Sequence, residues 1–277
     1  MSGVLSAHGA ATVADDAEAA AFAELYACAP PALQSRLGLR VERIADATLL
    51  LAPGLPESMF NRAIGLGLRQ EAGAAQVDAI VQAYRAAGCP TWWLHWNPHS
   101  TPESLPAMLP SMGFTQPARR SWAKVLHGPE PAPKIPTDLH IAPATASQLG
   151  EVIRAIVTAF EMPPFMADWL AALHGQPHWR VYAVTDGALV VGGGCLYVSG
   201  ELAWLGMGAV LPSHRRRGGQ GALMARRIAD AIEAGALHVV TETGEPIADE
   251  PNPSLANMKR CGFVTVASRL NFAGPAQ

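Results

Sequence analysis

Hydrophobic and polar positions in the second half of the chain follow helical and strand-like periods in turn. Met224, Ile228 and Ile232 recur at the spacing of one helix face, and the apolar run LHVVTET follows them. Glycines 192–194 interrupt one strand-like run, where we expect a bulge or a close backbone approach. An α/β (α+β) fold is indicated. The predicted elements are strand 138–142, helix 145–160, helix 164–174, strands 178–185, 188–198 and 201–211, helix 219–234, strand 237–243, short helix 253–260 and strand 263–272.

The first half repeats this pattern. Val77, Ile80 and Tyr84 form a helical stripe, and the strand-like run TWWLHW follows it. Both halves then show Ser-Leu, a short helical stretch and a Gly-Phe pair, at Gly113 and at Gly262. Upstream, FNRAIGLGL in the first half matches LAWLGMGAV in the second. We interpret the order of these elements as a duplication, although any two α/β halves share such features.

A proline-rich segment divides the two halves. The sequence HGPEPAPKIP at 127–136 carries four prolines, which suit neither a helix nor an inner strand. We therefore predict one domain at 1–126, a semi-rigid linker at 127–136 and a second domain at 137–277.

Composition narrows the possible partners. With 49% hydrophobic residues, 16% charged residues and a formal net charge of −3, the chain is typical of a globular protein and lacks the basic balance of a nucleic-acid or anionic-membrane binder. Its four cysteines form no C-x-x-C pair, so no metal site is expected. The N-terminus lacks the pattern of a signal peptide, and no apolar run suits a membrane span. These features predict a soluble cytoplasmic protein with no membrane partner; the oligomeric state stays open.

The sequence HRRRGGQG at 214–221 concentrates arginine beside glycine between a predicted strand and a predicted helix. A helix N-terminus exposes unpaired N–H groups, glycine lets an anion approach them, and arginine adds positive charge. A bound pyrophosphate fits this pattern. No Lys-Ser or Lys-Thr completes a Walker motif, and Leu211 stands where a dinucleotide fingerprint begun by Gly206 and Gly208 needs its third glycine.

The spacing matches V-x-P-x-x-R-x-x-G-x-[GA] at Val210, Pro212, Arg215 and Gly218, with Gln220 in the last place. A register one residue later completes the R-x-x-G-x-G core. Together with NPSLANMKRCGF at 252–263, the loop resembles the coenzyme A loop and final helix of the GNAT superfamily of N-acetyltransferases. The resemblance covers about 138–272. It implies two GNAT-like domains, each with a mixed, largely antiparallel central sheet flanked by helices.

The resemblance implies acetyl-CoA as the cofactor. Backbone amides from Arg216 to Ala222 would hold the pyrophosphate, and the strand edge at Ala209 would pair with the pantetheine arm. Asn252, Ser254 and Asn257 would line the arm, or would serve as a helix cap or turn. The implied cofactor-binding residues are Ala209, Val210, Arg215, Arg216, Arg217, Gly218, Gly219, Gln220, Gly221, Ala222, Asn252, Ser254 and Asn257.

The implied reaction is direct attack of a primary amine, borne on a small molecule, on the thioester in a ternary complex. Glu242 is the first candidate for the base and Glu245 the second, although a glutamate there can equally be solvated or ion-paired. The family often has a tyrosine on the last helix as the acid, but Met258 holds that position here, which leaves Ser254, water or departure of the thiolate. Candidate substrate-binding residues are Phe160, Glu161 and Trp204.

The first half lacks the loop. Its equivalent stretch LRQEAGAAQ at 68–76 has no arginine run and carries Glu71, which would repel a phosphate. We therefore expect a degenerate copy that completes the fold or walls the substrate cleft, with one coenzyme A per chain. A coenzyme-A-binding sensor without turnover and transfer of a longer acyl chain stay open. No nucleic-acid partner is expected, because binding through 215–217 would require a steep salt dependence of oligonucleotide binding. Aspartates at 218 and 219 are expected to abolish coenzyme A binding and leave the fold intact.

Overall fold

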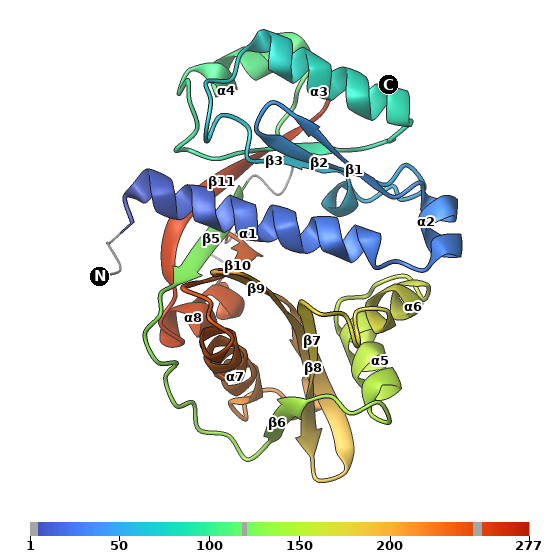
Figure 1. Cartoon of the computed structure of the whole chain (residues 1–277), viewed down its shortest axis with the longest axis vertical. Helices are drawn as coiled ribbons and strands as arrows, with labels where there is room; N and C mark the ends of the chain where they lie inside the picture. The colour runs from blue at the N-terminus through green and yellow to red at the C-terminus, as the bar shows by residue number, and fades with distance from the viewer. Residues whose placement is uncertain (1–4, 118–120, 246–250, 277) are drawn as a thin grey trace.

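The computed structural model describes residues 5–117, 121–245 and 251–276 (Figure 1). The elements of the first half are α1 Ala7–Ala27, α2 Pro31–Leu37, β1 Arg40–Ile44, β2 Ala47–Leu51, η1 Ser58–Phe60, β3 Arg62–Ile64, α3 Ala74–Ala87, β4 Trp93–Trp96, α4 Leu105–Met108, η2 Leu109–Met112 and β5 Ser121–His127. Those of the second half are β6 His140–Pro143, α5 Leu149–Ala159, α6 Met166–Ala171, β7 Trp179–Asp186, β8 Leu189–Ser199, β9 Leu202–Val210, η3 Pro212–His214, α7 Gly219–Glu233, β10 His238–Gly244, α8 Pro253–Arg260 and β11 Val264–Ala273.

The element order predicted for the second half is confirmed, with shifts at the element ends. The helix expected from residue 145 begins at Leu149, because Thr145 and Gln148 first form a turn in which the Gln148 N–H donates to Thr145 Oγ1 at 3.3 Å. In the first half, the counterpart of β9 is much shorter than the sequence repeat indicates. It ends at Ile64, because Gly65 and Gly67 adopt φ values of 90° and 83°, which a strand does not accommodate.

One mixed sheet runs through both halves. Its eleven described strands have the order β1-β2-β3-β4-β11-β5-β10-β9-β8-β7-β6. The last strand of each half pairs with a strand of the other half: β5 pairs with β10, and β11 pairs with β4 (Figure 1). This exchange gives each half a structural dependence on the other. The boundaries at 126 and 137 stay a prediction, and β5 reaches residue 127 at the first of them.

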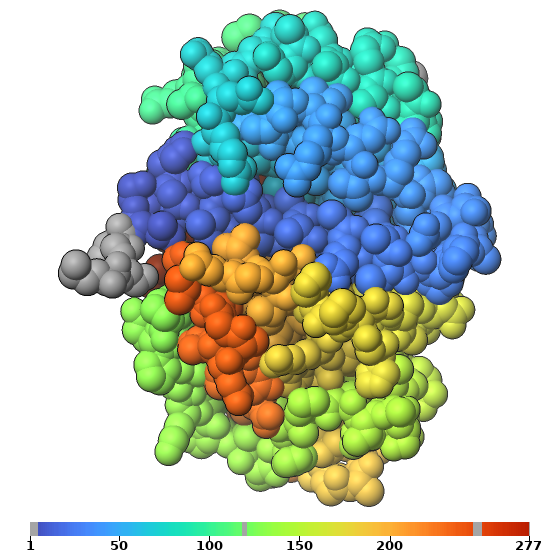
Figure 2. Space-filling view, viewed as in Figure 1, coloured from blue at the N-terminus to red at the C-terminus, as the bar shows by residue number. Residues whose placement is uncertain are grey.

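Helices cover both faces of the sheet. α1, α5 and α6 pack on one face, α3 packs on the opposite face in the first half, and α7 and α8 pack there in the second. α1 crosses the middle of the sheet, and its surface lies directly against the second half (Figures 1 and 2). None of the described helices has the length and apolar character needed to cross a membrane.

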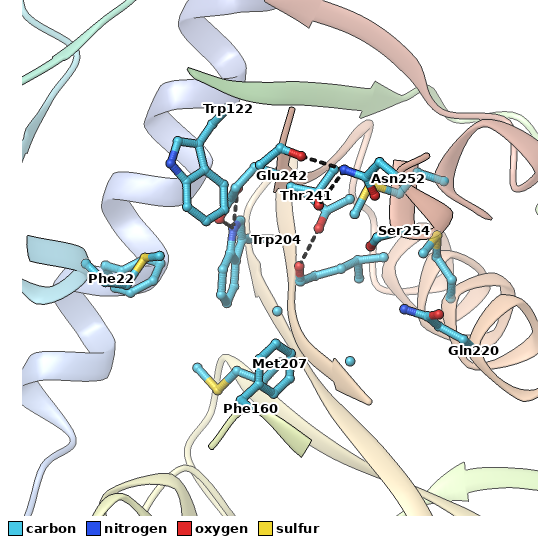
Figure 3. A pocket seen from close by; sticks show the side chains of 18 of the residues that line it. Phe22, Trp122, Phe160, Trp204, Met207, Gln220, Thr241, Glu242, Asn252 and Ser254 are labelled. Atoms are coloured by element: carbon cyan, nitrogen blue, oxygen red, sulfur yellow. Dashed lines mark hydrogen bonds between the residues drawn. The ribbon is translucent and has the colours of Figure 1, made fainter. Parts of the chain in front are cut away.

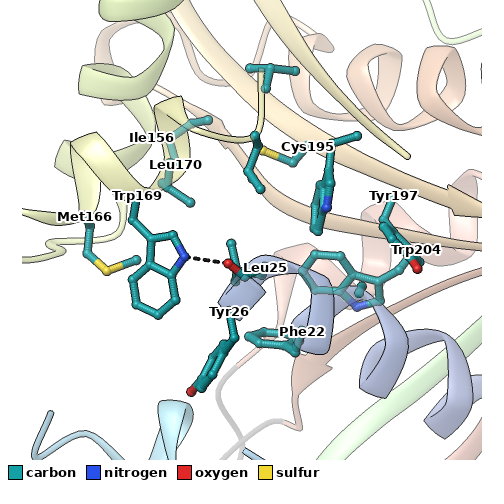
Figure 4. Close-up of a cluster of buried hydrophobic side chains, with 14 of the residues drawn as sticks. Phe22, Leu25, Tyr26, Ile156, Met166, Trp169, Leu170, Cys195, Tyr197 and Trp204 are labelled. Carbon is teal, nitrogen blue, oxygen red and sulfur yellow. Dashed lines mark hydrogen bonds between the residues drawn. The ribbon is translucent and has the colours of Figure 1, made fainter. Parts of the chain in front are cut away.

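The contact between α1 and the second half is an apolar core. Phe22 and Trp204 meet edge to face with ring centroids 5.2 Å apart, and the indole N–H of Trp169 donates to the Leu25 carbonyl at 2.7 Å (Figure 4). Aromatic pairs and a satisfied buried indole give this contact a fixed geometry. The first half therefore holds one side of the region around Trp204.

Candidate active site

The sheet forks between β9 and β10. Their parallel ladder joins Leu202–Trp204 to His238–Val240. Beyond it, β9 stays with β8, while β10 stays with β5. At the fork, Thr241 Oγ1 donates to the Leu205 carbonyl at 2.8 Å. The diverging ends of the two strands open a gap in the sheet.

A bulge in β9 bends it away from β10. The β8–β9 register shifts between Gly193 and Cys195, and Met207 has a φ of 55°. The bulge expected at the glycine triplet lies beside it in β8, where the register against β7 shifts between Val184 and Thr185. The close approach is also present: a Cβ on Gly194 would lie 2.9 Å from the Arg227 guanidinium. Small residues are required because the backbone and this guanidinium are in contact.

Arg227 reaches the bulge from α7 and is buried. Its Nη1 donates to the carbonyls of Cys195 and Gly206, each at 2.9 Å. Burial lowers the pKa of this guanidinium to about 10, so it stays a cation at neutral pH. A cation solvated by backbone carbonyls therefore lies behind the fork. Sequence reasoning missed it, although an arginine one turn after Leu223 on the buried helix face was a usable signal.

The arginine–glycine loop leads into α7. Gly218 is the N-cap, with a φ of 76° and no side-chain cap. Arg215 and Arg216 are exposed, whereas Arg217 is held by Asp138 and Asp186, each at 2.6 Å. The loop therefore offers two exposed guanidinium groups and the positive end of a helix to an anion. Arg217 instead fixes the loop to β7 and to the start of the second half.

Most predicted cofactor residues meet at one cavity of about 710 Å³. They are Ala209, Val210, Arg215, Arg216, Gly218, Gly219, Gln220, Gly221, Ser254 and Asn257. Arg217, Ala222 and Asn252 are not among the described residues that line it. Asn252 is the N-cap of α8, where its Oδ1 accepts from the Leu255 N–H at 2.9 Å, so the capping alternative is confirmed for it. Asn257 donates to Gln220 Oε1 at 2.9 Å and so ties α8 to α7.

The loop glycines also accommodate the proline-rich segment. A Cβ on Gly218 would lie 2.1 Å from the Pro136 carbonyl oxygen, and one on Gly219 would lie 2.7 Å from Leu139. Aspartates at these positions would displace that packing, so the expectation that they leave the fold intact is wrong. The arginines, whose side chains are exposed, are the better place to test the loop.

A second cavity, of about 640 Å³, adjoins the first (Figure 3). Phe160, Gly208, Gln220, Pro253 and Ser254 line both. Of the predicted substrate residues, Phe160 and Trp204 line the second cavity, whereas Glu161 is exposed and is not among its described lining residues. Met258, in the position expected for an acid, also lines this cavity and carries no exchangeable proton.

Glu242 lies on β10 in the wall of this second cavity, and its side chain is 10% exposed. Its Oε2 accepts from the Trp204 indole at 3.0 Å (Figure 3). The same oxygen accepts from Lys124 Nζ at 2.9 Å. Glu242 is therefore ion-paired, as one of the two expectations had it, and its carboxylate also reaches the cavity. Glu245 also lines the cavity, where its carboxylate accepts from the hydroxyls of Ser121 and Ser268.

Solved structures share this architecture. A GCN5-related N-acetyltransferase from Kribbella flavida is 18% identical, with a TM-score of 0.64 over 89% of this chain and 94% of that one. One from Sphaerobacter thermophilus is 17% identical, with a TM-score of 0.59 over 82% and 80%. A tandem GNAT protein from the clavulanic acid biosynthesis pathway is 15% identical, with a TM-score of 0.56 over 83% and 79%. The chain has a tandem GNAT fold. A scan of protein-family models and a search of curated proteins find no match.

The two GNAT copies are joined by a buried ionic network beside Glu242. Lys124 Nζ, which is fully buried, bridges Glu242 to Glu18 of α1 at 2.9 and 2.7 Å. Burial alone would raise the pKa of Glu18, but Arg269, Lys124 and Arg62 together hold it well below its usual value. Sequence reasoning missed this network, because its members become neighbours through the strand exchange.

In the first half, the loop between β3 and α3 is bonded to a carboxylate of the chain itself, that of Asp46 in the turn between β1 and β2. The carboxylate of Asp46 accepts from the backbone N–H groups of Gly67 at 3.0 Å, Arg69 at 2.8 Å and Gln70 at 3.3 Å. Glu71, which we expected to repel a phosphate, is instead exposed. The amides that could receive an anion are therefore already bonded to Asp46.

Asp46→Ala should lower the free energy of unfolding by about 1–2 kcal/mol, because three amides lose a charged acceptor in a partly exposed site. Urea denaturation would measure the change. Glu71→Ala is the matched control and should stay within about 0.5 kcal/mol of the native protein. Equal destabilisation by both variants would contradict the role assigned to Asp46.

No group of three or more His, Cys, Asp or Glu side chains arranged to hold a metal is found in residues 5–117, 121–245 and 251–276.

Proposed function

We propose that the protein is an acetyl-CoA-dependent N-acetyltransferase that acetylates a primary amine of a small molecule. The observation that carries this proposal is the junction of the two cavities at Gly208, Gln220 and Ser254. One cavity has the cationic loop and helix end expected for a pyrophosphate, and the other has the carboxylate of Glu242. The GNAT fold, shared with proteins named as N-acetyltransferases, supports this assignment.

The residues present fit coenzyme A. Arg215, Arg216 and the uncapped N-terminus of α7 face an anion site, and β9 beyond Trp204 has an edge facing the fork, where an extended arm can add as a strand. When bound, acetyl-CoA supplies the activated acetyl group as a thioester.

The side chains around the fork manage protons and charge. An ammonium has no lone pair, so the acceptor must give a proton to Glu242 before its nitrogen bonds to the acyl carbon and the carbon–sulfur bond breaks. The second proton that the nitrogen loses would pass to the leaving sulfur, so that free thiol is released. Ser254, at the junction of the cavities, would donate a hydrogen bond to the departing sulfur in place of the missing tyrosine. The Arg227 cation behind Gly208 would stabilise negative charge that develops there.

A calorimetric titration with acetyl-CoA tests the cofactor, and one site per chain is expected. The double variant Arg215→Glu with Arg216→Glu should weaken binding by about 100-fold, because it replaces two attractive charges with two repulsive ones. Arg85→Glu with Arg154→Glu makes the same charge change at exposed positions on α3 and α5 and should leave affinity within about twofold. If the native protein does not bind acetyl-CoA, or if both double variants weaken binding equally, the arginine–glycine loop is not the pyrophosphate site.

A coenzyme-A-binding sensor is the alternative that Met258 favours, since it removes the acid that the family often uses. Release of free thiol from acetyl-CoA when amines are added separates the two functions. A sensor would bind acetyl-CoA and release none.

A further inference from the structure

The cavity beside Glu242 has an unusually apolar wall for a site that contains carboxylates. The side chains that line this cavity and not the coenzyme A cavity, which is the cavity beside the arginine–glycine loop, come from both halves of the chain. Those from α1, η1, β4, β5 and the α5–α6 region are apolar, as is Trp204 of β9: Phe22, Leu25, Met59, Phe60, Trp93, Trp122, Met162, Met166 and Trp204. Aromatic and thioether groups offer dispersion and cation–π contacts and few hydrogen bonds. The first half contributes much of this wall.

The described residues of the cavity wall carry more negative than positive charge. Among the described lining residues, the carboxylates are Glu242 and Glu245, and the cation is Arg227. The Nη1 and Nε of Arg227 are occupied by backbone carbonyls. Glu242 lies beside the indoles of Trp122 and Trp204 (Figure 3). A carboxylate next to aromatic rings attracts an ammonium group twice, by charge and through the ring faces.

The two ends of the cavity differ. Gln220 and Ser254 lie on the side shared with the coenzyme A cavity, whereas Phe22, Trp122 and Trp204 lie on the other side (Figure 3). A ligand whose nitrogen lies near Glu242 would thus place the rest of its body against aromatic rings. Hydroxyl-rich or polycationic bodies would lose hydrogen bonds to water there without regaining them.

We infer that the acceptor is a primary amine on an apolar, ring-sized body, with its ammonium at Glu242 and its body against Phe22, Trp122 and Trp204. The inference rests on the proposed acetyl transfer for the role of this amine as acceptor. A long acyl chain is the competing occupant, but it would cover Glu242 and Glu245 without adding a hydrogen bond to those that the two carboxylates already accept within the protein.

Direct binding tests this inference without acetyl-CoA. The full-length protein is titrated with phenethylamine, 2-phenylethanol and ethanolamine, and both heat and tryptophan fluorescence are followed, because three indoles line the wall: Trp93, Trp122 and Trp204. Of the two comparison ligands, 2-phenylethanol has the aromatic ring without the ammonium group, and ethanolamine has the ammonium group without the ring. Phenethylamine should bind at one site, at least about tenfold more tightly than 2-phenylethanol or ethanolamine.

Two variants assign the contacts. Glu242→Gln should remove the preference for phenethylamine over 2-phenylethanol. Trp122→Ala should weaken the binding of phenethylamine by about tenfold, whereas Trp122→Phe should keep most of the native affinity. The Trp122 ring is part-exposed on β5, and folding of each variant is checked by circular dichroism.

Equal binding of phenethylamine and ethanolamine would overturn the inference, and so would undetectable binding of phenethylamine. Octanoyl-CoA binding at least about tenfold more tightly than acetyl-CoA, with no amine binding, would assign the cavity to an acyl chain. Selective phenethylamine binding by a protein that fails to bind acetyl-CoA would sustain the amine site and disprove the acetyl transfer.

Discussion

Glu242→Gln is expected to reduce acetyl transfer by about 10²–10⁴-fold while acetyl-CoA affinity stays within about twofold. The amide keeps nearly the shape of the carboxylate and can still accept from Lys124 and Trp204, but it cannot take a proton from the acceptor. Because the coenzyme A cavity lies beyond Ser254, its charge and packing are unchanged. Initial rates with a saturating apolar amine, together with an acetyl-CoA titration, measure the two effects separately.

Glu245→Gln is the matched comparison, because Glu245 lies on the wall of the same cavity. Its carboxylate accepts from two serine hydroxyls, so Glu245→Gln should lower the rate of acetyl transfer by less than about tenfold. If Glu245→Gln loses more rate than Glu242→Gln, Glu245 is the base instead.

Local sequence signals were sufficient for the elements and for the loop. The helical period through Met224 and Ile228 reports burial of one face of α7, and the run of arginine into glycine reports a turn before a helix N-terminus. Both depend on residues close together in the chain. The same signals overestimated β3, because glycines that interrupt a strand look alike whether they adjoin a bulge, as at Gly192, or end the strand, as at Gly65.

The site could be predicted in part. Glu242, Trp204 and Phe160 were found by their places at the end of a strand or in a loop, and they line the cavity. Trp122 was not found, because β5 reaches the site by exchange between the halves. Nothing local in the sequence reveals such an exchange. The same reason hid the partner of Glu242, which lies 118 residues away in the chain.

Lys124→Met should lower the free energy of unfolding by about 3–5 kcal/mol. The methionine fills a similar volume, but Glu18 and Glu242 lose the ammonium that lies between them in the interior. Glu18 retains Arg62 and Arg269, so the larger loss falls on Glu242, whose other partner is the neutral indole of Trp204. Urea denaturation would measure the change as a shift of the midpoint at constant slope.

A second substitution separates charge from packing. If the loss is electrostatic, Lys124→Met with Glu242→Gln should be more stable than Lys124→Met alone by about 1–3 kcal/mol, because the uncompensated carboxylate is gone. A double variant no more stable than the single one would mean that methionine packs poorly between the strands and that the ion pair carries little. Recovery would show that the cost of Lys124→Met is electrostatic, and therefore that a cation of the first half compensates the charge of Glu242 in the second.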